Sequence, residues 1–206
     1  MSVLVKICGV TRAQDAEAAV EAGADLIGLN FWPRSRRCVS IEAAVEIAAA
    51  IPGDVKKVGV FVNAPAPTVL ETAARVGLDL VQLHGDEDGA YARALGRPYI
   101  RAVRVASESD LRTIEDFDTD LILLDTPSAG YGGSGKTFDW ALARAARRYG
   151  RKLLLAGGLD ADNVVSAVRE VRPYAVDVAG GVESAPGIKD KHKLRRFIDA
   201  AKGLSS

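Results

Sequence analysis

Short apolar runs rich in β-branched residues alternate along the chain with longer segments whose apolar residues recur at helical spacing. The apolar runs contain few polar residues, as expected of strands that are covered on both faces. The predicted strands are residues 3–8, 25–31, 57–63, 80–84, 99–105, 121–125, 153–156 and 175–178. The predicted helices are residues 13–21, 41–50, 67–76, 88–95, 108–117, 140–149, 162–171 and 191–201.

This regular alternation predicts an α/β protein with parallel strand pairing and right-handed crossover connections. Eight repeats of the unit favour a closed (β/α)8 barrel, the TIM barrel, because closure removes the exposed sheet edges. An open doubly wound sheet is the alternative. We see no linker or low-complexity segment, so the sequence predicts a single domain over residues 1–206.

Composition and charge narrow the possible functions. Lys and Arg together number 27, as do Asp and Glu, so the net charge is zero. This balance argues against a dedicated nucleic-acid or anionic-membrane binder. We also find no signal peptide and no apolar run of the roughly 18 residues that a membrane span requires. With only two cysteines, expected to be free thiols, the sequence predicts a cytoplasmic protein.

Polar residues stand at the ends of most predicted strands, where barrel enzymes place their active sites. They are Cys8, Asn30, Asn63, His84, Arg104, Asp125 and Asp177. A buried cysteine alone is more often a small hydrophobe. A thiol, two carboxylates and a histidine that converge on one end of a barrel nevertheless predict a small-molecule site.

Two glycine turns follow the last two predicted strands: LAGGL at 155–159 and VAGGVE at 178–183. Barrels often bind phosphate at this position through backbone N–H groups and a short extra helix. We therefore predict that Gly157, Gly158, Gly180 and Gly181 bind a phosphate, and that a Cβ there would strain a positive φ or crowd the anion. Two ordinary tight turns are the alternative.

A third glycine-rich segment, GYGGSGKT at 130–137, fits the P-loop pattern of nucleotide-binding proteins. Several residues, including Pro127, separate it from the sixth strand. The eightfold strand–helix repeat also suits a barrel better than a P-loop sheet. A nucleotide-binding module is therefore a weak alternative.

Seven motifs together resemble one family, the phosphoribosylanthranilate isomerases of tryptophan biosynthesis. They are VKICGVT at 5–11, FWPRSRR at 31–37, VGVFVN at 58–63, VQLHGDE at 81–87, LLDT at 123–126, YGGSGKTFDW at 131–140 and VDVAGGVE at 176–183. They follow the family's order and span nearly the whole chain. The resemblance also explains the P-loop-like segment as the glycine-rich loop after strand six.

The resemblance implies an Amadori rearrangement of an aminated sugar phosphate, without a metal or cofactor. It assigns Cys8 as the general base and Asp125 as the general acid, and it places Arg37 against the anthranilate carboxylate. It puts Asp177 near the anthranilate amine. For His84, a structural role and a substrate contact are equally expected. Lys6 is expected on the other side of its strand from Cys8, in an ion pair.

The chain departs from the family in places. Ala179-Gly180-Gly181 stands where Ser-Ser-Gly is common, Asn30 where an apolar residue is usual, and Trp32 where Tyr is usual. Cys38 is expected to be a non-catalytic thiol. A monomer or a homodimer is expected.

The competing functions are another phosphosugar enzyme on the same barrel, which would need a lysine-rich or metal site, and a non-catalytic binding module.

Overall fold

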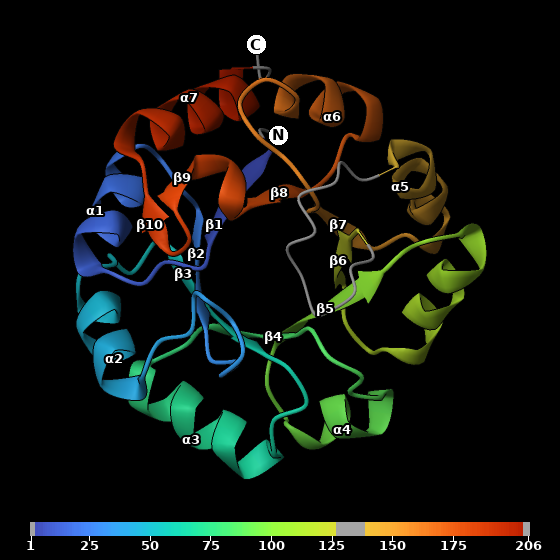
Figure 1. Cartoon of the computed structure of the whole chain (residues 1–206). Coiled ribbons are helices and arrows are strands. Elements are labelled where there is room, and N and C mark those ends of the chain that lie inside the picture. The colour runs from blue at the N-terminus through green and yellow to red at the C-terminus, as the bar shows by residue number, and fades with distance from the viewer. Residues whose placement is uncertain (1–2, 127–138, 204–206) are drawn as a thin grey trace.

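The computed structural model describes residues 3–126 and 139–203 and contains a closed barrel of eight parallel strands in sequential order. This confirms the predicted (β/α)8 barrel (Figure 1). The strands are β1 (Leu4–Cys8), β2 (Leu26–Asn30), β3 (Lys56–Phe61), β4 (Leu80–Leu83), β5 (Tyr99–Arg104), β6 (Leu121–Asp125), β7 (Lys152–Leu155) and β8 (Ala175–Val178). β1 pairs with both β2 and β8, so the sheet has no free edge there.

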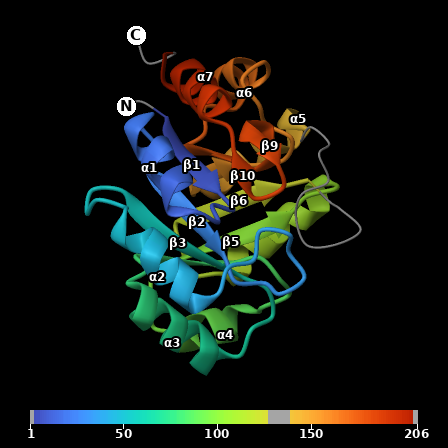
Figure 2. The same cartoon turned by 60° about the vertical axis from the view of Figure 1, so that its left-hand side comes forward.

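Helices surround the barrel, and the turned view shows them as an outer layer (Figures 1 and 2). They are α1 (Ala13–Glu21), α2 (Ile41–Ala49), α3 (Ala66–Val76), α4 (Gly89–Ala94), α5 (Trp140–Ala146), α6 (Val164–Val171) and α7 (Lys191–Lys202). Local chemistry sets several ends. The Ser40 side chain caps α2, the Asp190 side chain caps α7, and α3 ends at Gly77, whose φ of 69° suits glycine.

The fifth predicted helix is a 3-10 helix, η1 (Glu108–Asp116), instead of an α-helix. Its start is closed by a capping box between Ser107 and Asp110, and its Asp, Thr and Ile residues have low helix propensity. The sixth also changes form, because α5 continues as the 3-10 turn η2 (Arg147–Tyr149). The sequence missed three elements after β8: the 3-10 turn η3 (Gly180–Val182) and the antiparallel hairpin of β9 (Glu183–Ala185) and β10 (Ile188–Lys189).

The core has two parts. Inside the barrel, apolar side chains from most strands pack against one another: Leu26, Val58, Ile100, Ala102, Leu123, Leu154, Ala156 and Ala175. A larger apolar layer lies between the barrel and the helices. Strand residues alternate between these two layers, so polar side chains at the carboxyl ends of strands, such as Cys8 and Asp125, can point into the barrel interior, where a cavity opens.

The position of Lys6 differs from the one expected from the sequence. It stands two residues before Cys8 on β1, so both side chains lie on the same face of the strand, inside the barrel. The expectation that Lys6 points away from Cys8 was wrong. The predicted ion pair does exist: Lys6 is fully buried, and its Nζ lies 2.7 Å from Asp177 Oδ1. The pair forms because Lys6 and Asp177 are register partners on the neighbouring strands β1 and β8.

Candidate active site

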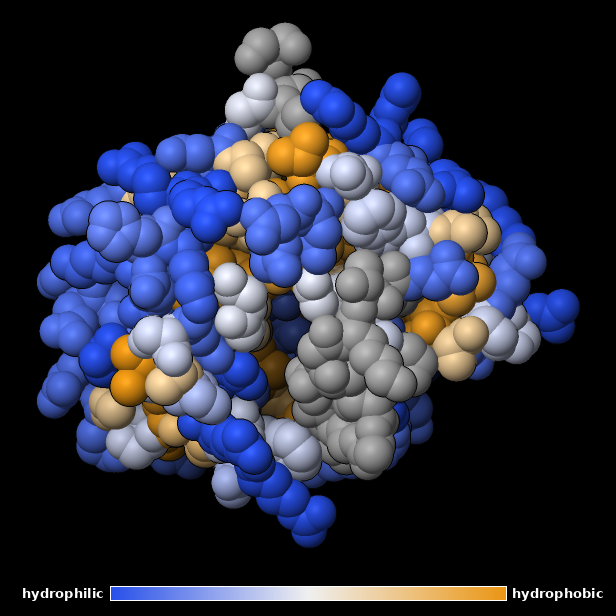
Figure 3. Space-filling model, turned by 45° about the horizontal axis from the view of Figure 1, so that its top comes forward, coloured by the Kyte–Doolittle hydropathy of each residue, from blue (hydrophilic) through white to orange (hydrophobic). Residues whose placement is uncertain are grey.

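A cavity of about 610 Å³ opens at the carboxyl ends of the barrel strands, a size typical of small-molecule sites. The space-filling view of this face is hollowed near its centre (Figure 3). The residues assigned by the family resemblance and the four turn glycines all line the cavity: Cys8, Arg37, His84, Asp125, Gly157, Gly158, Asp177, Gly180 and Gly181. Asn63 and Arg104, the other polar residues expected there from their place at strand ends, do not line it. Asn30 and Trp32, two of the departures, also line it, and the Trp32 N–H donates to Asn30 Oδ1 at 2.8 Å.

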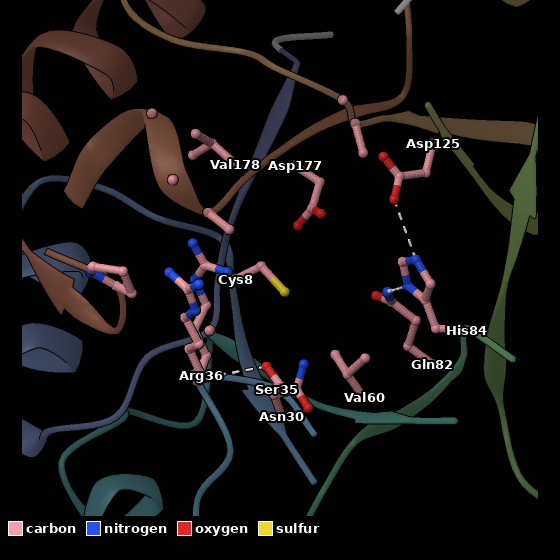
Figure 4. A pocket seen from close by; sticks show the side chains of 18 of the residues that line it. Cys8, Asn30, Ser35, Arg36, Val60, Gln82, His84, Asp125, Asp177 and Val178 are labelled. Carbon is pink, nitrogen blue, oxygen red and sulfur yellow. Dashed lines mark hydrogen bonds and ion pairs between the residues drawn. The ribbon is translucent and has the colours of Figure 1, made fainter. Parts of the chain in front are cut away.

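Cys8 is the last residue of β1, and its sulfur points into the cavity together with the Asp177 carboxylate (Figure 4). Burial raises the pKa of the Cys8 thiol above its usual value, and the Asp177 charge adds to this rise. The ammonium groups of Lys6 and Lys189 oppose it. Cys38 is exposed and, like Cys8, is a free thiol.

Asp125 ends β6, is buried, and faces His84 across the cavity wall (Figure 4). Its Oδ1 accepts from the Thr126 N–H at 2.8 Å, and its Oδ2 lies 3.2 Å from His84 Nε2. On the other side of the ring, His84 Nδ1 lies 2.8 Å from Gln82 Nε2. His84 is thus hydrogen-bonded, as the structural role requires, and it also lines the cavity, so its contact with substrate stays a prediction.

The direction of these hydrogen bonds decides where the proton lies. If the Gln82 amide donates to Nδ1, then the His84 Nε2–H donates to an Asp125 carboxylate. If Gln82 presents its oxygen instead, Nδ1–H donates to it and Nε2 accepts from protonated Asp125. The Gln82 Oε1 is buried without a partner among the described residues. The Gln82–His84 pair can therefore serve either protonation state of the acid.

Arg37 lies in the loop after β2 and meets a carboxylate of the protein itself. Its Nε and Nη2 each donate to one oxygen of Glu183 at 2.7 Å, a bidentate pair. Hydrogen bonding to Glu183 raises the pKa of Arg37. The predicted fork is present and at the cavity surface, but one edge is already occupied.

Sequence reasoning missed the other side of this contact. Burial opposes ionisation of Glu183, yet the hydrogen bonds and charges of Arg37 and Lys189 hold its pKa below the usual range. The buried Lys189 Nζ donates to Glu183 at 2.9 Å, to the Cys8 carbonyl at 2.6 Å and to the Ala179 carbonyl at 3.1 Å. It therefore ties the ends of β1 and β8 together. Glu183 is the last residue of the VDVAGGVE motif, whereas no sequence signal pointed to Lys189.

The glycine turns differ from one another. Gly157 and Gly158 have φ values of 87° and 63°, which disfavour any side chain. At Gly181, a Cβ would overlap the Leu159 carbonyl oxygen. At Gly180 a Cβ would meet only Arg37 Nη2, at 3.6 Å, without strain. The expected strain of a positive φ thus applies to Gly157 and Gly158. At Gly181 a side chain would clash with the backbone, and a cost at Gly180 would have to come from a bound anion. Gly180 also begins η3, a short extra helix at the place where barrels bind phosphate.

Three further expectations concern the P-loop-like segment, a metal site and a membrane span. The P-loop-like segment 130–137 lies outside the described residues. Within residues 3–126 and 139–203, no group of three or more His, Cys, Asp or Glu side chains could hold a metal ion. In the same part of the chain, no helix has both the length and the apolar character that crossing a membrane requires.

The fold and this cavity define a (β/α)8-barrel enzyme with a small-molecule site that combines a thiol, a carboxyl group and glycine turns. The sequence profile described as N-(5'phosphoribosyl)anthranilate (PRA) isomerase matches residues 5–200. The chain belongs to this family.

Individual members of this family are similar to the chain over nearly its whole length. The N-(5'-phosphoribosyl)anthranilate isomerase of Geobacter sulfurreducens is 52% identical over 98% of this chain and 99% of its own length. The crystal structure of phosphoribosyl anthranilate isomerase from Thermotoga maritima has a TM-score of 0.91 and 46% identity, covering 98% of this chain and all of the other. A phosphoribosyl anthranilate isomerase crystallised with reduced 1-(o-carboxyphenylamino)-1-deoxyribulose 5-phosphate has a TM-score of 0.89 and 43% identity, with 98% and 100% coverage.

Proposed function

We propose that this chain catalyses the Amadori rearrangement of N-(5-phosphoribosyl)anthranilate to 1-(2-carboxyphenylamino)-1-deoxyribulose 5-phosphate, a step of tryptophan biosynthesis. The observation that carries the proposal is the convergence of Cys8 and Asp125 on one cavity, from strands β1 and β6. One supplies a base and the other an acid, which this reaction needs at two different atoms of the same substrate.

In the proposed mechanism, Asp125 donates a proton to the furanose oxygen as the C1–O bond breaks, and C1 forms a protonated Schiff base with the anthranilate nitrogen. The Cys8 thiolate then removes the proton from C2. The C2–H electron pair forms a C1–C2 double bond, and the Schiff-base nitrogen takes up the C1–N π electrons. The enol then tautomerises: its O–H proton is lost, C1 gains a proton and C2 becomes the ketone. The substrate nitrogen is itself the electron acceptor.

The same cavity offers groups for both anionic ends of the substrate. The glycine turns after β7 and β8 suit the phosphate, since backbone N–H groups can approach an anion closely there. Arg37 suits the anthranilate carboxylate, for which the edge not used by Glu183 is available. Asp177 is proposed to lie near the anthranilate amine. Because Ala179 and Gly180 lack hydroxyl groups, phosphate affinity here should come mainly from the backbone.

A steady-state assay tests this function. Phosphoribosylanthranilate is generated in situ, and its fluorescence is followed after the protein is added. The expected result is a saturable loss of fluorescence with no requirement for an added divalent metal or ATP. Failure to convert this substrate would overturn the proposal. Activity only with metal would favour a sugar-phosphate epimerase, and tight ATP binding without turnover would favour a nucleotide-binding module.

A further inference from the structure

The proposed mechanism gives no role to the buried ammonium group of Lys6. Lys6 is fully buried inside the barrel, and its ammonium group donates to Asp177 Oδ1 at 2.7 Å. A buried ion pair is seldom worth keeping for stability, because the desolvation of both charges offsets their attraction. An apolar pair would fill this space at least as well. The position of Lys6 next to the cavity therefore calls for another reason.

The geometry at Gly28 brings Lys6 and Cys8 together. Gly28 on β2 is the register partner of Cys8 on β1. A Cβ at position 28 would lie 2.9 Å from the Cys8 sulfur and 3.2 Å from Lys6 Nζ. The two groups thus converge over the same glycine, and any side chain there would push between them. The hydrogen bond that Lys6 Nζ donates to Asp177 Oδ1 holds the ammonium group at this place.

The charges around Cys8 favour an anion at the sulfur. The ion-paired groups on this side of the cavity, from β1, the loop after β2, and β8 to β10, are Lys6, Arg37, Asp177, Glu183 and Lys189. Three of them are cations and two are carboxylates. A neutral Cys8 therefore leaves one positive charge unmatched, and the thiolate completes the balance.

We propose that Lys6 is a positioning residue that stabilises the thiolate of Cys8, while Asp177 holds the ammonium group in place. The inference rests on the proposed role of Cys8 as the general base. Burial by itself disfavours the Lys6 ammonium, but Asp177 and Cys8 outweigh it and raise the pKa of Lys6 above its usual value. Lys6 therefore stays charged at neutral pH. For Cys8, burial raises the pKa and Lys6 provides the largest opposing effect.

The test measures the thiol directly and needs no substrate. Wild-type protein and the Lys6→Met variant are treated with iodoacetamide between pH 6 and 10, and alkylation of each cysteine is followed by peptide mass spectrometry. Cys8 should react at least about tenfold more slowly in Lys6→Met near pH 7.5, since one unit of pKa changes the thiolate fraction tenfold. The midpoint of its pH profile should move to higher pH. Cys38, an exposed thiol of the same chain, should not change.

The Asp177→Asn variant should change the alkylation rate of Cys8 in the opposite direction. It removes a negative charge that raises the pKa of Cys8, so Cys8 should react faster while Cys38 again stays constant. Unfolding would expose Cys8 and speed its alkylation in either variant, so slower reaction in Lys6→Met cannot come from a damaged fold.

If Lys6→Met does not fold, Lys6→Met/Asp177→Asn removes both charges and is compared with Asp177→Asn alone. Slower alkylation of Cys8 in the double variant supports the proposal. Wild-type alkylation of Cys8 in folded Lys6→Met, or equal rates in the double and single variants, would overturn it. These outcomes do not depend on the isomerase assay, which tests the proposed function separately.

Discussion

The two sides of the cavity hold their proposed catalytic groups in different ways. The base side, formed by β1, β8 and the β9–β10 hairpin, surrounds Cys8 with the ion pairs Lys6–Asp177 and Arg37–Glu183–Lys189. The acid side, formed by β4 and β6, holds Asp125 by the backbone N–H of Thr126 and by His84. One side is organised by full charges, and the other by a histidine whose hydrogen bonds can run in either direction.

This difference follows from what each group must do. A thiol has to become an anion in a buried place, so fixed cations beside it are useful. A general acid has to hold a proton and then release it, and a strong fixed cation would keep it ionised. A neutral imidazole can donate to the carboxylate or accept from the acid. The comparison therefore teaches that a base and an acid can share one cavity when their electrostatic supports lie on separate strands.

The largest effect is expected at the centre of the base side. Cys8→Ala should lower kcat by about 10²–10⁴, the usual cost of removing a general base, with the fold retained. The matched control, Cys38→Ala, should be almost silent because that thiol is exposed and lies outside the cavity lining. Steady-state kinetics on both variants provides the measurement. Near wild-type kcat in Cys8→Ala would remove the base side from the mechanism.

Asp125→Asn tests the acid side. An amide cannot supply the acidic proton, so kcat should fall by about 10²-fold or more, and Asp125→Ala should be at least as damaging. KM should change little, because the proposed role is in the transition state. If KM alone rises, Asp125 binds substrate and the contrast between the two sides no longer describes a base and an acid.

Glu183→Gln sharpens the comparison through stability. The pKa of Glu183 is lowered in the folded chain, so its carboxylate stabilises the fold above its ordinary pKa near 4.5, and this contribution is lost as the pH falls below that value. The variant should be about 1–3 kcal/mol less stable at pH 7, because Arg37 and Lys189 lose a charged acceptor. Thermal unfolding at pH 7 and below pH 4 measures this. The difference between variant and wild type should shrink at the lower pH, and a constant difference would argue against charge as the cause.

The smallest effect concerns the turn between β8 and η3. Gly180→Ser restores a hydroxyl group where the family commonly has serine, and the backbone accepts a side chain there. We expect substrate or inorganic phosphate to bind about 0.5–1.5 kcal/mol more tightly, the net value of one hydrogen bond. Titration calorimetry with phosphate gives the answer. Gly181→Ser is the control variant, since its Cβ would overlap the Leu159 carbonyl oxygen and should disturb the turn. Weaker phosphate binding by Gly180→Ser would contradict the assignment of this turn to the phosphate.

The sequence by itself determined the repeating unit and the place of the chemistry. Its alternating strand and helix periods predicted the barrel, and most of the polar residues at strand ends line the cavity as predicted, Cys8 and Asp125 among them. This works because strand ends and glycine turns are local features, and closure of a parallel barrel always brings the carboxyl ends of the strands to one face.

Only the tertiary structure decided how those side chains are paired. Arg37 meets Glu183 across 146 positions of sequence, and Lys6 meets Asp177 across 171. The β9–β10 hairpin places Lys189 where its Nζ donates to the Cys8 carbonyl oxygen. Nothing in its local sequence distinguishes Lys189 from a surface lysine. Such contacts depend on strand register and on the closing of β8 against β1, and both are set by packing of the whole barrel instead of by any local pattern.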